Sequence, residues 1–194
     1  LHRMILSSST YRLSSQANEH AVRADPENRL LGRTAVRRLE AEAIRDALLF
    51  VSGQLDLGMG GSLLHVANRQ FLFDHTSKDG TTYDSYRRSI YLPVIRNHLF
   101  DVFQLFDYAD ASVTNGNRTT STVAPQALFM LNGDLVRAAM KALAGRALRE
   151  GGGESRDQIR FLYMATLARQ PRAEEIQQAQ SFVEQFRLAA AASG

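Results

Sequence analysis

The chain has 194 residues, of which 44% are hydrophobic, and it carries no cysteine and a formal net charge of only +3. The lack of cysteine excludes disulfides, thiolate metal sites and covalently attached haem c within this chain. No uninterrupted apolar run is longer than Ala47–Val51, far short of the roughly 20 residues that span a bilayer. The small charge excess is spread along the chain and gives no clear nucleic-acid signal.

The first third of the sequence predicts two helices. Asp25-Pro26 has the pattern of a helix start, an N-cap carboxylate followed by proline at the first helical position. Thr34 then predicts the cap of a longer helix that ends before Gly58. Its expected inward stripe consists of Val36, Leu39, Ala43, Ala47, Leu48, Val51 and Leu55.

The middle of the sequence predicts a small β-hairpin near residues 70–95. Gln70–Phe73 is apolar enough for a short strand, and residues 88–94 alternate in the manner of a second one. Pro93 lacks an N–H group, so the second strand should lie at an edge or stop there.

The remaining sequence predicts helices throughout. A short helix around residues 99–106 should bury Phe103 and Phe106 and leave Phe100 able to contact a neighbouring domain. Further helices should begin near Pro125 and Asp134. After the linker-like run Gly151-Gly152-Gly153, residues 154–190 should form a helical hairpin. The expected fold is mainly α: a helical core domain over 1–150 with a β-hairpin insertion, and a C-terminal helical hairpin packed on it.

A cluster of polar residues around one long loop is the best candidate for a binding site. Functional residues often lie on such loops, and a helix N-terminus near Pro125 offers free N–H groups to an anion. The same side chains can instead cap turns and satisfy the backbone. The cluster consists of Asp107, Asp110, Asn115, Arg118, Gln126 and Asn132.

Arg87 and Arg88 are further ligand-binding candidates, because guanidinium groups hold carboxylates or phosphates in a fork. A structural ion pair with Asp107 or Glu42 is the alternative. Glu40, Glu42 and Asp46 are expected on a salt-bridged helix rather than in an acid–base pair, and Glu40, next to the core stripe, would need a partner if buried. The histidines have no metal-ligand spacing, so no metal site is expected.

Several blocks of the sequence resemble one domain family. They are Leu1-His2-Arg3 with Ser9–Arg12, Asp25–Leu31, Arg37–Asp46, Tyr86–Tyr91, Phe106-Asp107 with Asp110, Thr122-Val123 with Gln126–Leu128, and Leu131-Asn132. The family is a C-terminal domain of unknown function in large planctomycete-type bacterial proteins, where it follows a c-type cytochrome domain and a second uncharacterised domain. The sequence starts inside an amphipathic pattern at Leu1–Leu6, without an initiator methionine, so we expect a piece of a longer chain. The resemblance implies that the longer chain is such a protein. It also implies upstream domains of the same parent chain as partners, haem c only in that upstream part, and a periplasmic or other extracytoplasmic location.

Two functional hypotheses follow, and the sequence leaves open whether the chain is an enzyme. The first is a non-catalytic structural or interaction module, which predicts an exposed apolar patch and no ligand-binding cleft with convergent charges. The second is part of a binding or catalytic site for a carbohydrate or another polar or anionic substrate. It predicts that Asp107, Asp110 and Arg118 converge in a pocket with Arg87 or Arg88.

Overall fold

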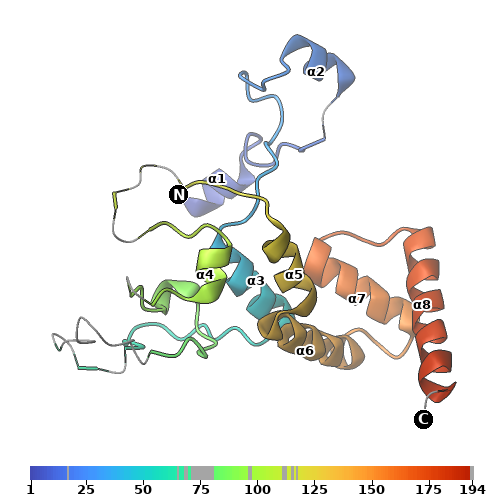
Figure 1. The fold of residues 1–194 in the computed structure, drawn as a ribbon. Coiled ribbons are helices and arrows are strands. Elements are labelled where there is room, and N and C mark those ends of the chain that lie inside the picture. Colours follow the sequence, from blue (N-terminus) through green and yellow to red (C-terminus); the bar gives the residue numbers. More distant parts are fainter. Residues whose placement is uncertain are drawn as a thin grey trace. The chain divides into compact units, whose positions relative to one another are not determined.

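The computed structural model describes residues 1–16, 18–64, 66–67, 70, 81–95, 98–110, 113–114, 116 and 118–192. Over these residues the chain forms eight α-helices and one short 3₁₀-helix, with no β-strand, so the mainly α prediction is confirmed. It divides into two compact units, residues 1–39 and 40–194. The elements are α1 (His2–Ser7), α2 (Glu19–Ala24), α3 (Ala41–Ser52), η1 (Ser89–Tyr91), α4 (Asp101–Leu105), α5 (Ala124–Asn132), α6 (Asp134–Glu150), α7 (Ser155–Leu167) and α8 (Ala173–Ala192), as Figure 1 shows.

The first unit shows that both helix starts predicted in this region are wrong. Helix α2 ends at Ala24, where the sequence predicts that a helix begins. The Asp25 carboxylate instead accepts hydrogen bonds from the backbone N–H groups of Leu30 and Arg29, which closes a loop and lowers the pKa of Asp25. Thr34 is not a helix cap either, because its hydroxyl donates to the Leu13 carbonyl at 2.8 Å.

Helix α3 begins at Ala41, later than predicted, and its buried face differs accordingly. Val36 and Leu39, expected in the apolar stripe, precede the helix and are 86% and 56% exposed. Gly53 follows Ser52 with a φ of +75°, the left-handed conformation that ends many helices. The buried positions of α3 are Ala41, Arg45, Leu48, Leu49 and Ser52.

The predicted second strand of the hairpin is wrong. Ser89–Tyr91 is a 3₁₀ turn, because the Asp46 carboxylate accepts the Ser89 N–H and the neighbouring carbonyls bond to Arg45. These groups are therefore not available for a β-ladder. The only pairing seen among the described residues here is an isolated bridge between Asp56 and Arg87. The expected first strand, residues 70–73, falls almost entirely outside the described residues.

The hydrophobic core of the second unit lies on both sides of α3. On one side, Ala41 and Leu92 pack with α4, where Phe103 and Phe106 are buried as predicted. On the other side, Leu48 packs against Val136 and Ala139 of α6. Phe100 is half-buried: its ring centroid lies 4.9 Å from that of Tyr83, on which it stacks, and 5.3 Å from that of Phe103, and its contact with a neighbouring domain stays a prediction.

The predicted helices of the C-terminal half are confirmed. Gly133 separates α5 from α6, and a Cβ atom at this position would lie 2.7 Å from the Phe129 carbonyl oxygen. Helices α7 and α8 form the expected helical hairpin, and α7 also contacts α6 (Figure 1). The division between residues 150 and 154 stays a prediction, since both sides belong to the second unit.

Candidate functional site

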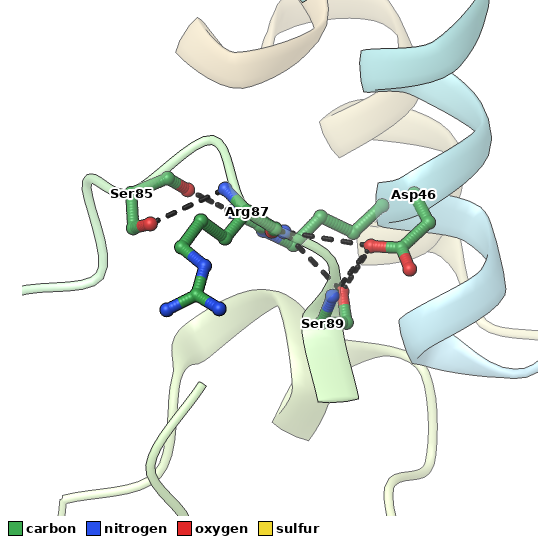
Figure 2. Close-up of polar contacts among 5 residues, drawn as sticks. Asp46, Ser85, Arg87 and Ser89 are labelled. Atoms are coloured by element: carbon green, nitrogen blue, oxygen red, sulfur yellow. Dashed lines mark hydrogen bonds and ion pairs between the residues drawn. The ribbon is translucent and has the colours of Figure 1, made fainter. Parts of the chain in front are cut away.

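A buried arginine ties α3 to the segment 85–89. Arg45 is only 1% exposed, and its Nη1 donates to the Arg87 carbonyl at 2.8 Å and to the Ser89 hydroxyl at 3.3 Å. Its Nη2 donates to the Ser85 carbonyl. Figure 2 shows Asp46 reaching across to Ser89, whose N–H and hydroxyl donate to the carboxylate at 2.8 and 2.6 Å. Burial lowers the pKa of Arg45, against the opposing effect of Asp46, and the network braces the loop onto the helix.

A second arginine clamps the N-terminal end of α3. The Arg118 guanidinium donates to both oxygens of Glu42, at 2.7 and 2.9 Å, and to Glu40 at 3.1 Å. It also lies 4.9 Å from the centroid of the Tyr108 ring. The hydrogen bonds to Glu42 raise the pKa of Arg118. For Glu42, burial alone would raise the pKa, but the hydrogen bonds from Arg118 and its positive charge have the larger combined effect, so the pKa of Glu42 is lowered. Both charges therefore stay ionised in a bidentate pair.

A pocket of about 420 Å³ lies between these two networks. Three carboxylates, Glu40, Glu42 and Asp46, line it together with the hydroxyl-bearing Ser89 and Tyr108. Ala43, Ile90, Leu92 and Val94 supply an apolar part of the wall. Such a lining can accept further hydrogen bonds from hydroxyl or amine groups, and because Arg118 and Arg45 already pair with its carboxylates, only a small net negative charge remains to disfavour anions.

The loop that follows α4 is fastened at both of its ends. Asp107 has a φ of +58°, unusual for a residue with a side chain, and its carboxylate accepts the N–H and hydroxyl of Ser121 at 2.8 Å each. Gln126, buried on α5, donates to the Leu105 carbonyl at 2.9 Å and accepts the Val123 N–H. We call these two sets of contacts, Asp107 with Ser121 and Gln126 with its two backbone partners, the clasp. The side chains of the clasp hydrogen-bond to the backbone, as the capping alternative predicts.

Arg87 and Arg88 both lie against Tyr91. The Arg87 guanidinium carbon is 4.1 Å from the ring centroid and that of Arg88 is 5.5 Å away. Arg87 also donates to the carbonyls of Gly58 and Gly60, at 2.9 and 2.5 Å. The ion pair expected between these arginines and Glu42 does not form, since Arg118 occupies both oxygens of that carboxylate.

The structure thus distributes five of the eight predicted residues over separate contacts, and Asn115 lies outside the described residues. Asp107 and Gln126 belong to the clasp, and Arg118 binds Glu42 at the N-terminal end of α3. Arg87 and Arg88 lie against the Tyr91 ring. Asp110 and Asn132 are exposed. Their role in ligand binding stays a prediction.

Sequence reasoning did not select Arg45, Ser89 or Tyr108. For Arg45 a signal existed, because it lies four residues after Ala41 and four before Leu49, at the centre of the buried face. The predicted stripe included Val36 and Leu39, which precede α3, and this shifted the expected buried face away from Arg45.

Two further properties bear on the class of site. In the described part of the chain, no group of three or more histidine or carboxylate side chains is placed to hold a metal ion. Within the same residues, no helix combines the length and hydropathy needed to cross a membrane.

Comparison with known proteins places the chain in a family. Residues 1–183 match PSD1, described as a protein of unknown function (DUF1553), and the chain belongs to this family. No curated protein and no solved structure shows significant similarity to it.

Proposed function

We propose that this PSD1-family chain is a non-catalytic interaction module that docks other parts of a larger protein. The observation that carries the proposal is that α5 packs Phe129 partly into the core but keeps a second apolar face outside. Its buried residue is the polar Gln126, whereas Leu128 and Leu131 are 57% and 74% exposed. With Ala124 and Ala127 they occupy positions i, i+3, i+4 and i+7, which form one stripe on the helix surface.

This arrangement differs from that of a helix that serves only its own core. An ordinary surface helix points its apolar stripe inward and its polar face outward. In α5 the hydrogen bonds of Gln126 and the packing of Phe129 fix the helix from its inner side, so the leucine face stays outward. An exposed apolar stripe on a fixed helix is a typical protein-binding surface.

The proposed partner is the upstream part of the parent chain. The support for it is the resemblance of the sequence to proteins in which this domain follows a c-type cytochrome domain. Haem c would reside in that upstream part, and the proposed location is periplasmic or otherwise extracytoplasmic. In this arrangement the module would help to position the cytochrome domain.

The test is calorimetric titration of the chain with the separately expressed upstream part. Binding with a negative heat-capacity change is expected, because apolar surface is buried. Leu131→Ser should weaken binding about tenfold or more, since an apolar side chain of this size contributes about 1.5–3 kcal/mol on burial. Leu148→Ser is the matched control, because Leu148 is 69% exposed on α6. An equal effect of the two variants, or no binding, would refute the proposal.

The acidic pocket favours a second candidate function, the binding of a neutral carbohydrate. Carboxylates, hydroxyls and an apolar wall suit a polyhydroxylated ligand better than an anionic one. A thermal-shift series with neutral and anionic oligosaccharides tests this. Neutral sugars alone should raise the melting temperature, and Glu40→Gln should abolish the shift while Glu174→Gln on α8 should not.

A further inference from the structure

Two apolar features of the second unit remain uncovered: a groove and a ridge. The groove has a volume of about 550 Å³ and runs between the end of α3 and one side of α7. Its lining residues are Phe50, Val51, Gly53, Leu55, Leu57, Arg146, Phe161, Met164 and Ala165. The ridge is the distal half of α8, where every residue from 180 to 192 is exposed.

The groove is held in shape by Arg146, whose charge is already neutralised. Its guanidinium donates to the Val51 carbonyl at 2.7 Å and pairs with Glu150 at 2.8 Å. The guanidinium carbon also lies 5.4 Å from the centroid of the Phe161 ring. The groove therefore offers a fixed apolar surface and no uncompensated charge from this arginine.

The ridge continues a stripe that packs inside the molecule at its other end. Ile176 is buried at the start of α8. The same stripe continues along the helix through Phe182, Val183 and Phe186, which are 68%, 50% and 66% exposed. The rings of Phe182 and Phe186 stack at 6.4 Å, so the uncovered part forms a continuous aromatic surface.

We propose that the ridge of one chain fills the groove of a second copy, and the reverse, to form a symmetric dimer. The contact is self-complementary, since each copy carries one ridge and one groove, and a twofold arrangement closes it. Helix α7 contacts α8 of its own chain and also lines the groove, so the four helices α7 and α8 of two chains would form the dimer core. This surface differs from the α5 face, and neither proposal depends on the other.

The exposed apolar area of the ridge and the groove is large enough for a specific interface only if both take part in the contact. At about 200 Å² for a whole phenylalanine, Phe50, Phe182 and Phe186 leave roughly 400 Å² exposed per chain. Leu57, Met164 and Val183 add roughly 150 Å² at about 100 Å² for each whole side chain. Two reciprocal contacts then bury about 1,100 Å², just above the roughly 1,000 Å² that a specific interface requires. Either contact alone would bury about half of that.

The experiment measures the molar mass of the chain by sedimentation equilibrium over about a thousandfold range of concentration. The expected result is a reversible dimer of twice the 21.6 kDa chain mass. Phe186→Glu on the ridge and Met164→Lys in the groove should each give a monomer. Circular dichroism should show both variants folded, because both side chains are exposed.

Mixing the two variants tests the reciprocal geometry. A mixed dimer retains one native contact, and in its other contact the carboxylate introduced on one ridge lies opposite the ammonium group introduced in the partner's groove. Because these charges attract, dimers should reappear in the mixture. Leu128→Ser on α5 is the control and should remain dimeric.

Three results would overturn the proposal. A native chain that stays monomeric would leave another domain or protein as the occupant of both features. A dimer that survives Met164→Lys would show that the ridges pair with each other or that another surface is used. Loss of the dimer in Leu128→Ser would move the interface to α5.

Discussion

Replacement of Arg45 by methionine tests whether the buried network holds the loop on α3. The substitution keeps much of the side-chain volume but removes the donors to the carbonyls of Ser85 and Arg87. Removing one partner from a buried charged network costs about 3–5 kcal/mol, because the remaining polar groups stay buried without their partners. We therefore expect Arg45→Met to lower the free energy of unfolding by about this amount.

The assay is urea unfolding of both proteins, followed by circular dichroism. An unchanged slope against urea concentration shows that the folded and unfolded states keep their surface areas. Arg137→Met on the exposed side of α6 is the control and should change stability by no more than about 0.5 kcal/mol. A loss below about 1 kcal/mol for Arg45→Met would refute the reasoning, because methionine would then satisfy the site through packing alone.

Three further predictions concern other parts of the second unit. Gly151→Ala should lower the free energy of unfolding in urea by about 1–3 kcal/mol, because the added Cβ atom would lie 2.5 Å from the Ala147 carbonyl oxygen. Gly153→Ala is the control and should leave stability unchanged, since a Cβ atom there meets nothing within 4 Å. Gln126→Leu should cost about 1–3 kcal/mol, measured in the same way, by leaving the Leu105 carbonyl without its donor; a neutral result would contradict the clasp. The hydrogen bonds from Arg169 lower the pKa of Glu175 to about 2 from 4.5, so its stabilisation is present above pH 4.5 and is lost as the pH falls towards 2. Glu175→Gln should therefore lower the melting temperature at neutral pH but not at about pH 2, and an equal difference at both would contradict this assignment.

The sequence determined the helical class and the C-terminal half of this protein. Proline at the start of α5, Asn132-Gly133-Asp134 at the break and the glycines from Gly151 to Gly153 act through local backbone chemistry. Such signals depend on residues a few positions apart, which is why the helices from α4 to α8 were predictable. The buried positions of Phe103 and Phe106 followed in the same way from helical spacing.

The tertiary structure alone decided the start of α3, the 3₁₀ turn at Ser89 and the candidate site. Thr34 is an effective helix cap in isolation, but its hydroxyl bonds to Leu13, 21 residues earlier. Residues 88–94 alternate like a strand, but Asp46 bonds to the backbone that a strand would need.

The same reason explains why the sequence did not reveal the site. Apart from the adjacent Asp46, the partners of Arg45 lie 40 to 44 residues away along the chain, and Arg118 reaches Glu42 across 76 residues. A buried charge is stabilised only by the groups that the fold brings to it, so its position cannot be derived from local periodicity. In α8, only the packing shows that half of the apolar stripe stays uncovered.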